Sequence, residues 1–555
     1  MKKSLWLMLV AVLSCSLALS ACSGGKNAGS GDGNGGTGAA AGSGTGSGQD
    51  TKPVDITFFA PQGKAPLEDN DYTKLVEKKF NVNIKWDLAP ADALTDRRQL
   101  LLASGDYPEV FLEGKFTNTD LLTYGMQGVF IPLNDLIDKY APNIKAMMAK
   151  KPYFKDAMTA PDGNIYGIPR LNECYHCTFS QKYWINKDWL DKLGLKVPTT
   201  TDELYTVLKA FKTKDPNGNG KADEIPLTGA PNKYVWNGNI DAFLMNAFIY
   251  NDNDKYLTVS GGKVDFAANK PQWKEGLAYM HKLYKEGLID PASFTQNDQA
   301  LGQLGNREGD EIVGSVTTAL VSYLVNVYDD TITRHKHWVI VPPLKGPEGV
   351  QLAGESQGIS EFEFAITNKA SEAQQIAAIK IADYAFSEEG ALYSEYGPEQ
   401  GIGWNLAGPN EKNIEGKPAK YTFENLKPQD PNAVINNSWS LLGPKDLSKE
   451  FRDLFAASQD PLSSKGYERR LADATKQYEP YGPKEVYPTG VYIRPEDADM
   501  AAQLTTSIKD YVQSNMAQFI IGDKDIDKDW DAYVKGFDGL NLAKYIQIYQ
   551  DAIQK

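Results

Sequence analysis

The order of apolar and polar residues after position 50 predicts alternating strands and helices. An apolar run at 51–61 reads as a strand, helical spacing follows at 69–80, and a second strand is predicted at 81–90. Residues 95–104 continue as a helix, and 109–113 read as a third strand. Strands that alternate with amphipathic helices indicate βαβ units around a mostly parallel sheet. The predicted fold class is therefore α/β.

Further along the chain, capping residues mark the predicted helix boundaries. One helix begins at Thr200, with Glu203 as its capping-box partner, and another begins at Ser371, directly after a strand predicted at 361–370. The polar segment 295–299 is predicted as a turn.

The N-terminus has the features of a secretory signal. Lys2 and Lys3 form a cationic start, Leu5–Leu19 an apolar stretch, and Cys22 closes the segment. This end resembles the lipobox of bacterial lipoproteins, which implies cleavage before Cys22 and acylation of its sulfur; an ordinary signal peptide with a chance cysteine is the alternative. Residues 23–50 are rich in glycine and lack large apolar residues, so they are expected to form a tether.

Composition excludes some partners. The net charge is −14 and no basic cluster is present, so nucleic acids and anionic membrane surfaces are not expected to bind. Aromatic residues make up 11% of the chain, and such side chains could line a sugar-binding cleft. Cys174 and Cys177 lie outside the signal and are expected to form a local disulfide or to remain thiols, since His176 alone does not complete a four-ligand zinc site.

Several segments resemble a known family. They are PDGNIYGIPR at 161–170, the run from Trp184 to Phe211, DPNGNGKADEIPLTG at 215–229 and the C-terminal stretch 525–550. The chain is similar to the family 1 extracellular solute-binding lipoproteins of carbohydrate ABC transporters, nearest the alginate-oligosaccharide-binding branch and its Gram-positive relatives. The similarity covers Lys52–Lys555.

This resemblance implies a two-lobed, periplasmic-binding-protein-like fold with a ligand cleft between lobes joined by hinge crossings. It also implies a monomer, lipid-anchored at the extracytoplasmic face of the bacterial cell membrane, that captures an oligosaccharide and delivers it to ABC permease subunits without cleaving it. The expected organisation is a signal peptide at 1–21, a lipidated tether at 22–50 and first-lobe segments at 51–170 and 311–370. The second lobe is expected at 171–310, and 371–555 is expected to be mainly second lobe and C-terminal helices.

The segment from Asp215 to Pro226 has the spacing of an EF-hand-type calcium loop, although Pro226 stands where the usual bidentate ligand would be. The resemblance to alginate-binding proteins supplies an adjacent acidic pair in its place. The expected oxygen ligands are Asp215, Asn217, Asn219, Lys221 through its carbonyl, Asp223 and Glu224. A structural calcium ion is predicted, with a metal-free turn as the alternative.

Enzymatic function is not expected. Residues 354–358 match G-x-S-x-G, but no histidine follows Ser356, as a nucleophile elbow requires. Two alternatives stay open at this point. One is a lipid-anchored glycosidase, which needs two carboxyls about 5–10 Å apart. The other is a surface lipoprotein without a small ligand.

Candidate ligand contacts are aromatic residues in loops and polar residues at strand ends. The predicted set is Trp236, Trp404, Trp439, Arg170 and Glu113. Surface or hinge ion pairs would explain Arg170 and Glu113 equally well. The negative net charge disfavours acidic sugars unless a local arginine offsets it, so both acidic and neutral oligosaccharides remain candidates.

Overall fold

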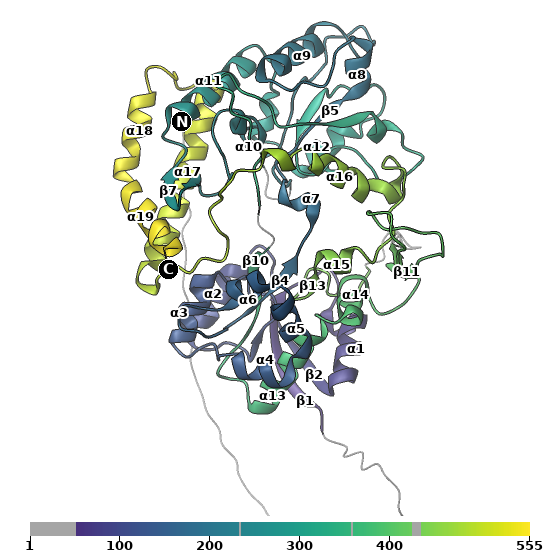
Figure 1. Ribbon diagram of the computed structural model, residues 1–555, viewed down its shortest axis with the longest axis vertical. Helices are drawn as coiled ribbons and strands as arrows, with labels where there is room; N and C mark the ends of the chain where they lie inside the picture. The colour runs from purple at the N-terminus through teal and green to yellow at the C-terminus, as the bar shows by residue number, and fades with distance from the viewer. Residues whose placement is uncertain (1–51, 232–234, 357–358, 424–434, 555) are drawn as a thin grey trace, which may run out of the picture. The chain divides into compact units, whose positions relative to one another are not determined.

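The computed structural model describes residues 52–231, 235–356, 359–423 and 435–554. The predicted signal, tether and Cys22 lie outside these residues. Hydrophobic residues form two large, separate cores, and each core defines a lobe (Figure 1). The smaller lobe is built on residues that include Ile56–Leu171 and Phe362–Phe386, and the larger lobe on residues that include Phe179–Ala353 and Tyr467–Tyr549. The two-lobed α/β architecture expected from the sequence is confirmed.

A six-stranded sheet lies at the centre of the smaller lobe, in the order β13-β4-β10-β3-β1-β2. β1 pairs in parallel with β2 and β3, as the βαβ pattern predicted, while β10 runs antiparallel between β3 and β4. The strands are β1 (Val54–Pro61), β2 (Val82–Ala89), β3 (Val110–Phe111), β4 (Ile168–Asn172), β10 (Ile359–Ile366) and β13 (Asp446–Leu447).

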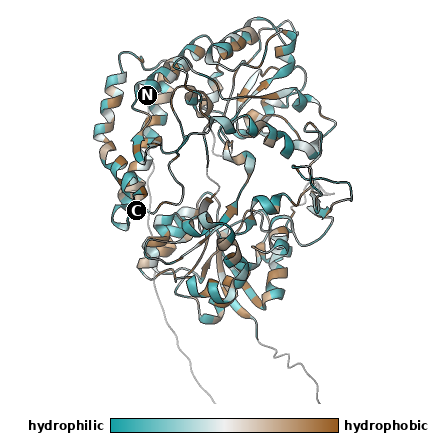
Figure 2. Cartoon of the chain, viewed as in Figure 1, coloured by the Kyte–Doolittle hydropathy of each residue, from teal (hydrophilic) through white to brown (hydrophobic). Residues whose placement is uncertain are grey.

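Some helices of the smaller lobe contact this sheet, and hydrophobic and hydrophilic residues alternate along the helices of this lobe (Figure 2). Ser371 caps α13, as predicted, and its hydroxyl accepts from Gln374 N within a capping box. The helices are α1 (Asp71–Phe80), α2 (Leu94–Ser104), α3 (Asn118–Met126), α4 (Asn134–Tyr140), α5 (Pro142–Lys150), α6 (Pro152–Met158), α13 (Glu372–Tyr384) and α14 (Glu388–Tyr396).

The larger lobe contains a three-stranded sheet, β8 (Ser315–Thr317), β5 (Tyr183–Asn186) and β9 (Trp338–Val341). Both pairings are antiparallel, unlike the mostly parallel arrangement that the sequence predicted. The difference arises because the partners of β5 come from more than 120 residues along the chain, beyond the reach of a local pattern. A hairpin of β6 (Leu257–Ser260) and β7 (Lys263–Phe266) contacts the C-terminal α19.

Helices of the larger lobe come from both halves of the chain, and α11 packs against α17 (Figure 1). Thr200 caps α9 by accepting from Glu203 N, while the Glu203 carboxylate accepts from Thr199 N instead of closing the box on Thr200. The predicted turn at 295–299 is present at Thr295, and Asn297 then caps α12 by accepting from Ala300 N. The helices are α8 (Lys187–Lys192), α9 (Thr201–Thr213), α10 (Ile240–Leu244), α11 (Pro271–Lys285), α12 (Asp298–Gly305), α16 (Tyr467–Lys476), α17 (Ala498–Ile521), α18 (Trp530–Gly539) and α19 (Leu542–Ile553).

The chain crosses between the lobes more than once. The first crossing runs from Leu171 to Phe179 and contains the short helix α7 (Tyr175–Thr178), and the second runs from Ala353 to Phe362. A small third cluster next to the smaller lobe includes β11 (Trp404–Leu406), β12 (Tyr421–Phe423) and α15 (Lys449–Arg452). The range 311–370, expected as a return of the first lobe, contributes to both cores.

Candidate functional site

Two adjoining cavities of about 860 and 590 Å³ lie between the lobes, and we refer to them together as the interlobe cleft. On one side are Phe116 and Tyr124, which pack with the smaller core, and on the other are Leu257 and Tyr549 of the larger core. The residues that line both cavities come from the second crossing and from a later loop: Glu355, Ser356, Ile359 and 488–491.

The lining combines flat rings with hydroxyl groups. Rings offer stacking surfaces to the apolar faces of sugars, and hydroxyls donate and accept hydrogen bonds. The rings are Phe116, Tyr124, Tyr153, Tyr250, Tyr487 and Tyr549, and the hydroxyl residues include Thr117, Thr119, Thr123, Thr178, Ser356, Thr505 and Thr506. Each cavity has the size of a small-molecule site.

Two of the five predicted ligand residues pack in apolar clusters. Trp439 is buried in the smaller core, where its Nε1 donates to Thr73 Oγ1 at 2.9 Å. Trp404 is buried in the third cluster, and its Nε1 donates to the carbonyl of Gly397 at 2.9 Å. Both indole N–H groups have protein partners, so we assign neither residue to the cleft.

The other three predicted residues do not line the two cavities. Arg170 forms an ion pair with Glu113 at 3.4 Å, and Gly443 N donates to the same carboxylate at 2.9 Å. Burial raises the pKa of Glu113, and Arg170 opposes that shift. Trp236 is half-buried, and its carbonyl accepts from Ala319 N at 2.9 Å.

Reasoning from the sequence missed the residues that do line the cleft. Tyr487 lies in the segment VYPTGVYI, where proline and glycine next to aromatic residues mark an exposed loop. Glu355 lies within the G-x-S-x-G match, a pattern that points to a nucleophile and not to a sugar-binding carboxylate. Among the described residues, none of the four histidines is hydrogen-bonded to Ser356, whose Oγ instead lies 3.5 Å from Ser180 Oγ.

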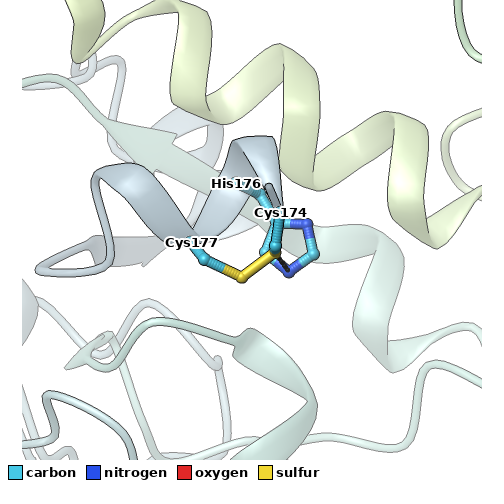
Figure 3. Close-up of side chains that lie close together, drawn as sticks. All are labelled: Cys174, His176 and Cys177. Carbon is cyan, nitrogen blue, oxygen red and sulfur yellow. Dashed lines mark hydrogen bonds between the residues drawn. A yellow bond between two sulfur atoms is a disulfide. The ribbon is translucent and has the colours of Figure 1, made fainter. Parts of the chain in front are cut away.

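Cys174 and Cys177 form a disulfide in the first crossing, one of the two states that the sequence left open (Figure 3). His176 lies beside it, with Nε2 3.4 Å from Cys174 Sγ and Nδ1 3.2 Å from Glu468 of α16. These three residues are the one group in the described part of the chain whose metal-ligating atoms lie within 4.8 Å of one another. Sulfurs joined to each other offer no thiolate, so this group is not a metal site.

The loop after α9 holds the acidic residues that the sequence predicted as cation ligands. The Asp215 carboxylate accepts from the N–H groups of Gly218, Asn219 and Gly220 at 2.9–3.1 Å. The Nδ2 of Asn219 donates to Asp223 at 3.2 Å.

Within the same loop, Glu224 Oε1 is buried and has no hydrogen-bond partner among the described residues. Burial raises the pKa of Glu224, and the charges of Asp215 and Asp223 raise it further. A buried carboxylate oxygen without a donor, next to two more carboxylates, fits a hard divalent cation.

A two-lobed α/β chain with a ligand-sized cleft between its cores has the design of a binding protein, which closes on a solute without transforming it. Residues 64–392 match the family of bacterial extracellular solute-binding proteins, and the chain belongs to that family. It is a binding protein and not an enzyme, which rules out the glycosidase alternative. No helix in the described part of the chain is both long enough and apolar enough to span a membrane.

Three relatives narrow the comparison. The chain is 31% identical to the fructooligosaccharide ABC transporter substrate-binding protein FusA of Streptococcus pneumoniae over 86% of this chain and 85% of FusA. FusA in complex with kestose superposes with a TM-score of 0.73 at 28% identity, over 90% of this chain and 99% of FusA. The polygalacturonan/rhamnogalacturonan-binding protein YtcQ of Bacillus subtilis is 28% identical over 60% of this chain and 63% of YtcQ. Alginate-binding protein AlgQ2 without calcium superposes with a TM-score of 0.67 at 25% identity, over 91% of this chain and 98% of AlgQ2.

Proposed function

We propose that this chain captures an oligosaccharide in the interlobe cleft and, as a monomer, delivers it to the permease subunits of an ABC importer. The observation that carries the proposal is the cleft itself, whose rings and hydroxyls come from both lobes. The likeness to FusA, named as a fructooligosaccharide transporter component, supports it. A sugar that touches both walls binds most tightly when the lobes close on it, so it shifts the population toward that arrangement.

Calorimetric titration of the purified protein with kestose, and with other oligosaccharides, tests this proposal. We expect stoichiometric binding with no new reducing ends, and a ligand at 100 times its Kd should add about 2.7 kcal/mol to the free energy of unfolding. Absence of binding across the set, together with scattering curves that the sugars leave unchanged, would refute the proposal.

Calcium belongs to the proposal as a structural ion in the loop after α9. Its support is the unpartnered Glu224 oxygen beside Asp215 and Asp223, together with the existence of an EF-hand mutant of FusA, whose structure superposes with a TM-score of 0.72. When bound, the ion would neutralise the converging carboxylates. Asp215, Asn217, Asn219, the Lys221 carbonyl, Asp223 and Glu224 would hold it.

A lipid anchor at Cys22 completes the proposal, with the chain held at the outer face of the cell membrane. Each buried methylene of an acyl chain contributes about 0.8 kcal/mol, so two or more chains would anchor the protein stably. Cys22→Ser is expected to move the protein from the membrane fraction to the medium, as measured by fractionation of expressing cells. Retention of the variant in the membrane fraction would refute the anchor.

A further inference from the structure

Carboxylates dominate the charge of the interlobe cleft. Its lining contains six acidic side chains and two basic ones. The acidic residues are Asp120, Asp156, Asp252, Asp254, Glu355 and Asp499, and the basic residues are Arg98 and Lys255. A concave site lined mostly by one sign of charge favours solutes of zero or opposite charge.

Both basic side chains are already engaged by the protein. Arg98 donates to the carbonyls of Gly114 and Lys115 at 2.6 Å and lies 3.9 Å from Asp120. Its side chain is 5% exposed and its Nε is buried, so it presents little charge to a solute. Lys255 is held 2.6 Å from Asp254.

Arg170, the arginine that could have offset the negative charge for an acidic sugar, is also neutralised. It pairs with the buried Glu113 and lies 3.4 Å from the carbonyl of Gly443. The neighbouring Lys445 is fully buried and pairs with Glu395 at 3.2 Å. Neither cation is available to pair with the carboxylate of a uronic acid.

Among the acidic residues of the cleft, Asp156 and Asp499 are exposed, whereas Glu355 is half-buried. It lines both cavities, and among the described residues no hydrogen bond or ion pair engages its carboxylate, although its backbone carbonyl accepts from the Tyr250 hydroxyl at 3.4 Å. Burial alone raises its pKa. A half-buried carboxylate without a donor can accept hydrogen bonds from solute hydroxyls, and it repels a second carboxylate.

We propose that the interlobe cleft selects uncharged oligosaccharides, that Glu355 accepts hydrogen bonds from their hydroxyls, and that the same carboxylate excludes uronic acids. This inference rests on the proposed function and deepens it by naming the substrate class. It separates the chain in specificity from relatives named for polygalacturonan or alginate, despite the shared fold.

The test titrates the purified protein with two sets of trisaccharide-sized probes. The neutral set is kestose, maltotriose and galactotriose, and the anionic set is trigalacturonate and trimannuronate. We expect at least one neutral probe to bind and both anionic probes to bind at least about 100-fold more weakly, since like charges in an interface cost several kcal/mol. Comparable or tighter binding of an anionic probe would overturn the selectivity, whereas absence of all binding would instead count against the proposed function.

Variants then test Glu355 itself. Glu355→Gln keeps the shape and removes the charge, and it should weaken the best neutral probe about tenfold, because a charge-assisted hydrogen bond becomes a neutral one. Glu348→Gln, at an exposed position outside the cleft, is the matched control and should bind like the parent. Unchanged affinity of Glu355→Gln for the neutral probe would overturn the role of Glu355. Thermal melts confirm that both variants are folded.

Discussion

Removal of calcium is expected to destabilise the loop after α9. The effect of replacing Glu224 on stability should change sign between the calcium-free and the calcium-bound protein. In the absence of a cation, Glu224 is a half-buried carboxylate with one buried oxygen, and its charge is opposed by Asp215 and Asp223. Glu224→Gln removes that repulsion, so the calcium-free variant should be at least as stable as the calcium-free parent. With calcium present, the parent gains a ligand oxygen that the variant lacks, and the order of stability should invert.

The magnitude follows from mass action. An extracellular calcium site with a Kd of about 0.1 mM, at about 1 mM calcium, stabilises the folded state by about 1.4 kcal/mol. For a lobe-sized folding unit this corresponds to a rise in Tm of roughly 3–5 °C. The assay is a calcium titration against EGTA, followed by differential scanning calorimetry of parent and variant.

Magnesium at the same concentration serves as the control, because its demand for near-octahedral geometry fits a loop of this kind poorly. The reasoning fails if calcium leaves the Tm of the parent unchanged, or if Glu224→Gln is destabilised equally with and without calcium. Either result would show that the Glu224 carboxylate does not face a cation.

Three further predictions concern the lobe boundary. Arg170→Met should cost about 3–5 kcal/mol by urea unfolding, because it leaves the buried Glu113 charge unpaired; the double variant with Glu113→Gln should recover much of the loss, and equal single and double losses would contradict this. Lys182 is fully buried and burial lowers its pKa to about 7, so the unfolded chain binds the extra proton above that pH. Relative to Lys182→Met, the parent should therefore gain about 1.4 kcal/mol per pH unit between pH 7.5 and 10, and parallel pH curves would refute this. Opening the short disulfide loop with the Cys174→Ser, Cys177→Ser double variant should cost only about 2 kcal/mol, and a much larger loss in denaturant titrations would show that the bond does more than restrict the unfolded chain.

The sequence predicted those parts of the fold that depend on neighbouring residues. β1 and the helix that begins at Ser371 follow from local periodicity and capping chemistry, and both are present. Within the polar segment at 295–299, Thr295 lies in a turn as predicted, but Asp298 and Gln299 belong to α12. Asparagine serves turns and helix caps equally well, and here Asn297 caps that helix. The antiparallel pairing of β5 depends on residues far along the chain, which no local pattern reveals.

The cleft was predictable in kind but not in detail. Phe116, Tyr250, Glu355 and Tyr487 are separated by more than 100 residues each and meet only in the folded chain. Polar neighbours in the sequence favour the tryptophans as ligand contacts, yet Trp439 packs edge-on against Tyr72 and Trp86 within the smaller core. Flanking glycine or serine indicates where the backbone turns, but it does not indicate whether the aromatic ring points into the core or into a cleft.

Because the cores combine segments far apart in the sequence, they constrain when the chain can fold during its synthesis. The larger core combines Phe179–Ala353 with Tyr467–Tyr549, so its apolar surface stays incomplete until the chain has been made as far as Tyr549. Domains built from contiguous sequence can fold one after another as they emerge. Here the larger lobe can fold only after α17, α18 and α19 have been made. A truncation before Ala498 would leave a product with exposed apolar surface that is prone to aggregation and proteolysis and has no intact larger lobe.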